Sequence, residues 1–253
     1  MWEDRKGSCT VLSWTRSPFF AFPGSRYTHY NVSMPWFDQD AIEFFRELEL
    51  NNNKEWFEKN KKRYEACVKK SMEAFADHMI ERMRELLPDI SMTGKQAVFR
   101  IYKDVRFSKD KTPYKTNAGM HINNGGKGNL SSPGLYFNID ARTMGIASGC
   151  YQLEPPALKK MREYLAANLD EFQRQLDDKD FQKYFGGIKG EANKVLSADL
   201  REAAAMQPLL FNKQFYYWSE NDAEEALRDD LGEVLMEHMR ACRGMNEFLK
   251  RGL

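Results

Sequence analysis

A long apolar stripe in the first half of the chain most constrains the fold. From residue 57 to residue 86, large apolar side chains recur at every third or fourth position, the spacing of one face of an α-helix. Pro88 and Asp89 end the pattern. The sequence therefore predicts one long helix whose apolar face is buried against a second layer. The stripe consists of Phe57, the apolar stem of Lys61, Tyr64, Val68, Met72, Phe75, Met79, Met83 and Leu86.

A shorter helix is expected before it, over residues 41–50, with Asp38 or Asp40 as its cap. The run Asn51-Asn52-Asn53 interrupts the helical pattern, because asparagine competes with the helix backbone for hydrogen bonds. Two N-terminal helices joined at these asparagines are therefore predicted.

Strand patterns dominate the middle of the chain. Alternating apolar and polar residues predict strands over 96–108, 119–123, 135–140 and 144–151, and the last two flank a tight turn and form a hairpin. Residues 123–134 are a loop by composition. Short consecutive strands with short connections favour an antiparallel meander.

Helical patterns return in the last third. We expect helices over 157–168, 170–177, 180–185 and 199–206, a strand over 215–218 and a closing helix over 221–242. On that closing helix His238 faces inward with the apolar side chains. Residues 34–253 are thus predicted to be a single α+β domain, an antiparallel sheet meander packed against long N-terminal and C-terminal helices, mainly on one face.

Residues 1–33 differ from the rest, because they contain eight Ser or Thr residues and no helical or strand period. They are interpreted as a disordered extension or as a misassigned start, with translation beginning at Met34. An organellar transit peptide is a third interpretation, although Glu3 and Asp4 count against it. The four cysteines are widely spaced and form no C-x-x-C pair, which favours reduced thiols and a cytoplasmic location.

Partners are limited by charge and hydropathy. The chain has a net charge of +1, which counts against a generic nucleic-acid coat. No apolar run reaches the length of a membrane-spanning helix, so no membrane association is expected. The oligomeric state is left open.

Residues 99–116 concentrate positive charge. They hold six basic and two acidic residues, a local net charge of +4. As a strand, this segment would bury Phe99, Ile101, Val105 and Phe107 on one side and present its polar residues on the other. A lysine-rich loop follows directly.

We interpret this segment as the binding site of an anionic small molecule that carries phosphate or carboxylate, in a binding protein or an enzyme. Asp104 would orient the arginines, and Tyr114 would contact the ligand. The opposing interpretations are an architectural Arg–Asp–Arg ladder and a solvated basic loop. Asn53 could add an amide at a helix start, although helix capping explains it better. The expected ligand-binding residues are Asn53, Arg100, Tyr102, Arg106, Ser108, Lys109, Lys111, Thr112, Tyr114 and Lys115.

Catalytic groups are weakly indicated. The candidates are Asp104, Asp110, Tyr114 and His121, and nearby cations should lower the pKa of the two carboxylates, which suits a base or a positioning group. His238 and Cys242 share one helix face, but two such residues alone are more often packing than metal ligands. We therefore predict no metal site, and no cofactor is indicated.

An aromatic run at residues 211–218 offers an alternative function. Together with the basic segment it could stack nucleobases and bind nucleic acid. A buried strand with one exposed face explains the run at least as well. A third possibility is a non-catalytic domain in which the basic segment only locks strand to loop.

Several motifs along the chain form a recognisable pattern: Phe44-Phe45, Asn52-Asn53-x-x-Trp56-Phe57, Tyr64 and Arg100-x-Tyr102-x-Asp104-x-Arg106-Phe107-Ser108-x-Asp110-Lys111-Thr112-Pro113-Tyr114-Lys115-Thr116. This pattern resembles that of a conserved hypothetical family, a domain of unknown function found in bacteria and fungi. The resemblance spans residues 37–248 and implies no particular reaction or cofactor. The chain departs from the family pattern at residues 147–151 and 196–208.

Overall fold

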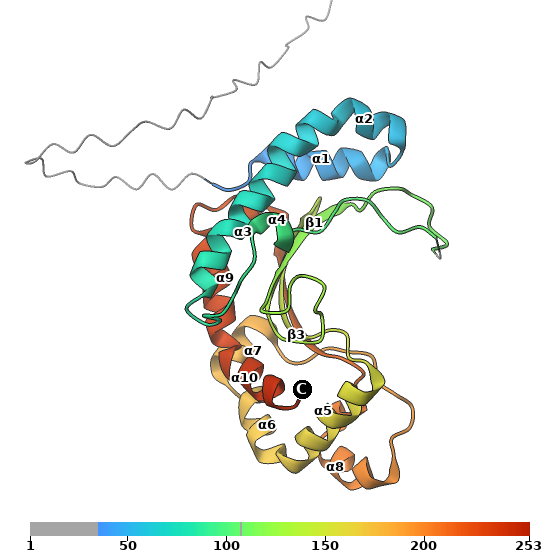
Figure 1. Ribbon diagram of the computed structural model, residues 1–253, viewed down its shortest axis with the longest axis vertical. Coiled ribbons are helices and arrows are strands. Elements are labelled where there is room, and N and C mark those ends of the chain that lie inside the picture. The colour runs from blue at the N-terminus through green and yellow to red at the C-terminus, as the bar shows by residue number, and fades with distance from the viewer. Residues whose placement is uncertain (1–34, 107) are drawn as a thin grey trace, which may run out of the picture. The chain divides into compact units, whose positions relative to one another are not determined.

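A computed structural model describes residues 35–106 and 108–253 (Figure 1). The interpretations of residues 1–33 lie outside the described residues. The described part forms a single α+β domain, as the sequence predicts, and belongs to one compact unit, Ser33–Leu253.

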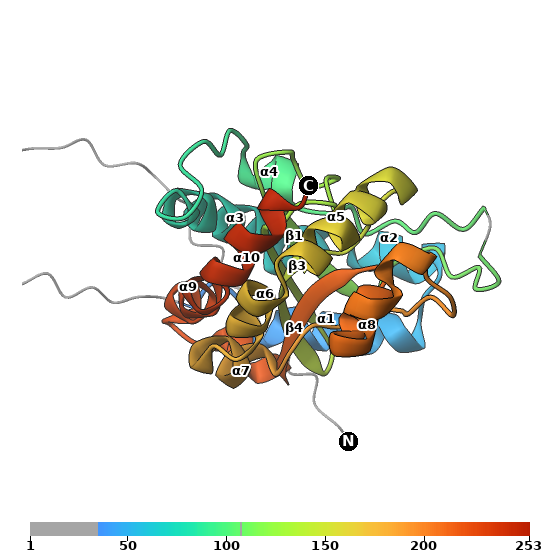
Figure 2. The same cartoon turned by 90° about the horizontal axis from the view of Figure 1, so that it is seen from below.

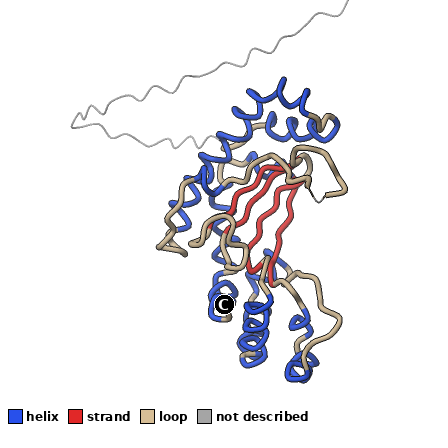
Figure 3. The backbone as a smooth tube through the Cα atoms, turned by 45° about the vertical axis from the view of Figure 1, so that its right-hand side comes forward, coloured by secondary structure: helices blue, strands red, loops and turns tan. Residues whose placement is uncertain are grey.

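One four-stranded antiparallel sheet organises the domain (Figure 3). Its strands are β1 (Asn117–Ile122), β2 (Leu135–Asp140), β3 (Thr143–Cys150) and β4 (Phe215–Asp222), in the order β1-β2-β3-β4. Met120 pairs with Phe137, Phe137 with Ile146, and Ala147 with Trp218. The predicted meander is therefore confirmed, with β4 as a long-range addition to its edge.

The predicted long helix is also confirmed. It consists of α2 (Lys54–Arg63), a π-helical turn (Tyr64–Lys69) and α3 (Lys70–Met83), which follow one another without a break. Asn51 caps the end of α1 (Gln39–Leu50), and Asn53 caps the start of α2. The other α-helices are α4 (Gly94–Ala97), α5 (Pro155–Ala167), α6 (Leu169–Leu176), α7 (Lys179–Phe185), α8 (Arg201–Met206), α9 (Leu231–Ala241) and α10 (Arg243–Arg251).

The two faces of the sheet have different roles. Because side chains alternate along a strand, Met120, Phe137 and Ile146 point to one face, where all three are fully buried. Helices α1, α3, α9 and α10 pack on the sheet, and α3, α9 and α10 lie together on one side of it (Figures 1 and 2). The opposite face carries Tyr136, Ala147 and Trp218 and is partly open.

The predicted strand over 96–108 is wrong. Thr93 and Gln96 form a capping box, which starts the short helix α4 at the position where the strand was expected to begin. In the described part of this segment the backbone makes two isolated bridges, Val98 with Met120 and Tyr102 with Tyr114. The predicted burial of alternate residues holds only in part, since Ile101 is buried while Val105 is half-buried; Phe107 lies outside the described residues.

The predicted start of the closing helix is also wrong. Strand β4 continues through Asp222, because its backbone pairs with β3 along the whole length of that strand. A 3-10 turn at Ala223–Leu227 follows, and α9 begins only at Leu231. His238 does face inward, as expected. Among the described helices, none has both the length and the apolar character needed to cross a membrane.

Two buried histidines join elements of the fold. In His121, Nδ1 lies 3.0 Å from the Lys127 carbonyl oxygen and Nε2 lies 3.3 Å from the Asn123 amide nitrogen. In His238, Nδ1 lies 2.7 Å from the Val234 carbonyl oxygen and Nε2 lies 3.1 Å from the Ser219 hydroxyl. A neutral ring with its hydrogen on Nδ1 satisfies both sets of contacts. Burial lowers the pKa of both rings below 6.5.

We expect these rings to make the protein sensitive to mild acid. The unfolded chain binds protons at a pH where the folded protein keeps both rings neutral, so the free energy of unfolding decreases as the pH falls through about 6.5. Urea unfolding between about pH 7 and pH 5 measures this slope. The double variant His121→Gln and His238→Gln should have a shallower slope, and an unchanged slope would contradict the assignment.

Candidate functional site

The basic segment is fixed to the N-terminal helices at Tyr114. The Asn52 amide nitrogen donates to the Tyr114 carbonyl oxygen at 3.0 Å, and the Tyr114 backbone N–H donates to the Asn52 side-chain oxygen at 3.1 Å. The Tyr114 ring is buried and stacks on Phe57, with ring centroids 4.0 Å apart. The two stretches that carry the family resemblance therefore pack against each other.

Asn53 has a structural partner. Its side-chain oxygen accepts a hydrogen bond from the Trp56 backbone N–H at 3.0 Å, as an N-cap does. Capping explains this residue without a ligand.

Residues 103–113 form a loop closed by a short two-stranded ribbon. The Lys103 N–H donates to the Pro113 carbonyl at 2.9 Å, and the Lys115 N–H donates to the Ile101 carbonyl at 2.7 Å. These bonds hold the ends of the loop together, so the predicted strand and loop are in fact a single excursion from the sheet. Tyr102, just before the loop, and Ser108, within it, are both exposed.

The charged side chains of this loop largely contact each other. Asp104 accepts from Arg106 Nε at 2.9 Å and Nη2 at 2.6 Å, and Asp110 accepts from Lys103 Nζ at 2.6 Å. The Lys111 ammonium donates to the Val105 carbonyl oxygen at 2.9 Å. These hydrogen bonds hold the pKa of both carboxyl groups below its usual range, so neither is suited to donate a proton.

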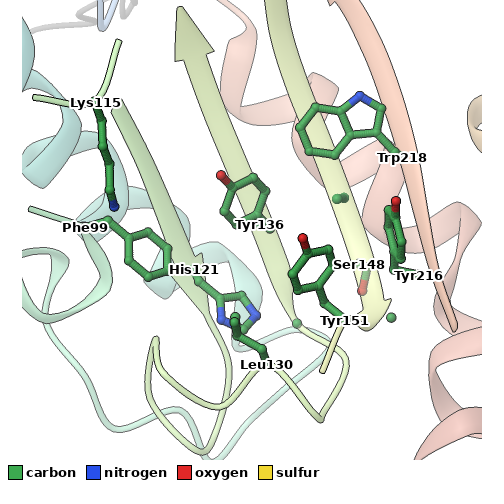
Figure 4. A pocket seen from close by; sticks show the side chains of 12 residues that line it. Phe99, Lys115, His121, Leu130, Tyr136, Ser148, Tyr151, Tyr216 and Trp218 are labelled. Atoms are coloured by element: carbon green, nitrogen blue, oxygen red, sulfur yellow. The ribbon is translucent and has the colours of Figure 1, made fainter. Parts of the chain in front are cut away.

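A cavity of about 290 Å³ lies on the open face of the sheet (Figure 4). Its walls are rich in aromatic side chains, and they come from all four strands and from the segments that precede β1, precede β2 and follow β3. The residues on which the argument rests are Phe99, Lys115, Tyr136, Tyr151, Tyr216 and Trp218.

Small residues make room for these rings. On the open face, β3 presents Gly145, Ala147 and Gly149, next to Trp218 and Tyr216 on β4. A methyl group added at Gly145 would lie 2.2 Å from a ring carbon of Trp218. Gly149 has a φ of 102°, a conformation that a larger residue adopts only with strain. The cavity is thus built by glycine and alanine facing large aromatic neighbours.

One wall of the cavity is cationic. The Lys115 ammonium lies 5.3 Å from the Phe99 ring centroid and makes no ion pair with any described carboxylate. Burial, together with the fields of Arg100 and Lys127, lowers the pKa of Lys115. Lys127 itself donates to the Val98 carbonyl oxygen at 2.5 Å. No acidic side chain is among the described residues that line the cavity.

Polar atoms on the aromatic wall also lack partners. The hydroxyl groups of Tyr136, Tyr151 and Tyr216 and the indole N–H of Trp218 make no hydrogen bond with any residue in the described part of the chain. Burial raises the pKa of Tyr136, so this phenol stays protonated. The wall therefore offers four donors to a molecule in the cavity.

The structure brings together only a few of the predicted site residues. Lys115 and His121 line the cavity, and Arg100 lies close enough to Lys115 to lower its pKa. Both nitrogens of His121 are engaged by Lys127 and Asn123, which leaves no free base there. Of the described residues from 102 to 114, none lines the cavity.

The aromatic run only partly forms core. Phe215 and Tyr217 are buried, whereas Tyr216 and Trp218 alternate with them and reach the cavity. Sequence reasoning did not place Tyr136, Tyr151, Tyr216 and Trp218 together. The sequence did contain one indication of this face, because glycine or alanine occupies every second position from 145 to 149. Small residues on one face of a strand leave room for a large side chain or a ligand to approach.

Within residues 35–106 and 108–253, no three His, Cys, Asp or Glu side chains cluster as metal ligands would. Cys67, Cys150 and Cys242 are free and buried. His238 and Cys242 make hydrogen bonds within the core.

We predict that Asn52→Ala lowers the free energy of unfolding by about 2 kcal/mol, because it leaves two Tyr114 backbone groups without partners. Chemical denaturation followed by circular dichroism measures the change. Asn60→Ala is the matched control, since Asn60 makes only a local bond to the Trp56 carbonyl, and it should stay within about 0.5 kcal/mol of the parent. An equal decrease in the free energy of unfolding in the two variants would contradict the proposed role of Asn52 in joining the basic segment to α2.

Comparison with known proteins agrees with the resemblance in the sequence. A search of the curated proteins finds no match to the chain. The model of the DUF2461 family, described as a conserved hypothetical protein, matches residues 40–248. Since the match spans most of the chain, the protein belongs to the DUF2461 family of conserved hypothetical proteins.

Proposed function

We propose that this protein binds an anionic small molecule, bearing phosphate or carboxylate, in the cavity on the open face of the sheet. The observation that carries the proposal is the half-buried Lys115 ammonium, which faces an aromatic cavity without a carboxylate partner among the described residues. Natural proteins rarely desolvate a lysine without pairing it, so its partner is expected to come from outside the chain.

The cations around Lys115 strengthen this argument. Burial, Arg100 and Lys127 all disfavour the charged form of Lys115. An anion bound there would replace repulsion between cations with attraction, in surroundings where charges are poorly screened. We assign Lys115 to bind the charge directly and Arg100 to reinforce it, while Lys127 is partly occupied by the Val98 carbonyl.

The loop at 103–113 has a supporting role in this proposal. Lys109 and Lys111 of this loop are exposed, and none of its described residues lines the cavity. A cluster of cations beside a cavity raises the rate at which anions arrive, and salt weakens this effect. We therefore assign the loop to attracting the anion from solution and the cavity to binding it specifically.

Nucleic-acid binding is the second candidate, because Tyr216 and Trp218 of the aromatic run face the same cavity as Lys115. The volume of about 290 Å³ favours a single small molecule, since a polymer needs an extended groove with several phosphate contacts. A strand of nucleic acid would bind with a salt dependence that reports several phosphates, whereas a small anion would not.

We expect Lys115→Met to weaken the binding of small anions by about tenfold or more, because a charge-assisted hydrogen bond is lost. Isothermal titration with pyrophosphate, citrate and ribose 5-phosphate measures the effect. Lys59→Met is the matched control, since it removes the same charge from an exposed ion pair with Glu55 on α2. Equal affinity in both variants, or no anion binding by the parent protein, would refute the proposal.

The affinity should also depend on pH. Lys115 loses its charge at a lower pH than an ordinary lysine, whose pKa is 10.5. Binding of a fully ionised anion should therefore decline as the pH rises through this lowered pKa, and Lys115→Met should show no such decline. Titrations from neutral to alkaline pH measure it, and a pH-independent affinity in the parent protein would contradict the assignment.

A further inference from the structure

We propose that the anionic ligand of this cavity carries a planar heteroaromatic ring, so that the whole molecule has the size and chemistry of a mononucleotide. The inference rests on the proposed function, because Lys115 holds the anionic group. It adds a second subsite, formed by the aromatic side chains over β2 and β4.

The first support is the way in which Trp218 is seated. Its ring lies so close to Gly145 that an added methyl group would be 2.2 Å from one ring carbon and 2.4 Å from the next. The sheet therefore covers one side of the indole, and the remaining surface borders the cavity. A large ring supported on one side by a glycine can serve as a platform for stacking.

The second support is that the aromatic groups form a row across the sheet. Phe99, Tyr136 and Trp218 follow one another, with centroid distances of 6.3 Å and 6.0 Å. Tyr151 meets Tyr216 edge to face at 5.2 Å. Figure 4 shows the Lys115 ammonium beside Phe99 at one end of this row and Trp218 at the other. An elongated ligand with its charge at one end and its ring at the other matches this layout.

The third support is the exposure of the rings. Tyr151 is 53% exposed, and Tyr136, Tyr216 and Trp218 are only half-buried. Contiguous aromatic surface left open to water costs free energy, and natural proteins retain it where a partner covers it. A flat partner covers such a surface most completely.

The polar atoms of the aromatic wall favour a ligand with a heteroaromatic ring over one with a hydrocarbon ring. Three tyrosine hydroxyls and the Trp218 indole N–H lack partners in the described part of the chain, and a hydrocarbon ring would leave them so. Ring nitrogens, carbonyls and amino groups would satisfy such atoms.

The size of the cavity limits the ligand to one such unit. A volume of about 290 Å³ is at the small end for ligand sites and suits one ring system with one anionic group. Chains of several bases would extend beyond it.

The test compares ligands that contain both parts with ligands that contain one. Isothermal titration of the full chain uses AMP, GMP, CMP and UMP, with ribose 5-phosphate as the anion without a base and adenosine as the base without an anion. We expect at least one mononucleotide to bind about tenfold more tightly than either fragment, the gain typical of one stacked base. Trp218→Leu should remove this gain and leave the affinity for ribose 5-phosphate unchanged.

Gly145→Ala provides a second, independent variant, because its methyl group would displace the indole without removing it. It should reduce mononucleotide affinity selectively, with circular dichroism confirming that the sheet is retained. Leu50→Ala is the control, since this side chain is 85% exposed on α1 and lies outside the cavity lining.

Each contrary outcome has a distinct meaning. If ribose 5-phosphate binds as tightly as every mononucleotide and depends on Lys115, the ring subsite is refuted and the proposed anion site stands. If adenosine binds as tightly as AMP, the proposed anion site is refuted. If no mononucleotide binds at millimolar concentration, or if Trp218→Leu and Gly145→Ala bind like the parent, the inference is overturned. Tighter binding of an oligothymidylate, with a steep salt dependence, would overturn it in favour of nucleic acid.

Discussion

The paired hydrogen bonds between Asn52 and the Tyr114 backbone are the joint on which the functional half of the structure depends. They fix the start of the long helix to the segment that leads into β1. Lys115 is the next residue after this joint, and β1 begins two residues later, at Asn117. The same contact therefore sets the position of the cavity lysine and the point at which the sheet begins.

The sheet separates stability from binding. Its core face holds large apolar residues that pack under α1, α3, α9 and α10. For example, Phe75 on α3 packs against Phe137 on β2, with ring centroids 5.4 Å apart. On the opposite face, small residues lie next to large aromatic rings. This arrangement packs less tightly and leaves aromatic surface in contact with water. Tightly packed faces have no room for a ligand, so this difference locates the cavity.

Much of the fold could be predicted because its signals are local. The stripe from Phe57 to Leu86 and the hairpin around Ala141 needed only periodicity and turn chemistry. The strand expected at 96–108 failed because a capping box at Thr93 and Gln96 and a contact with Asn52, far away in sequence, decided the conformation of that segment. Strand pairing is non-local, and a single strand pattern does not reveal whether a partner is present.

The sequence by itself determined the α+β class, the long helix, the meander and the concentration of positive charge before β1. Each depends on residues close together in the chain, where spacing and side-chain type dominate. Only the tertiary structure decided that the basic loop pairs mostly with itself, and that Lys115 meets Tyr136, Tyr151 and Trp218 around one cavity. These residues come from separate segments, and Trp218 joins the others only through the antiparallel pairing of β4 with β3, which no local pattern encodes.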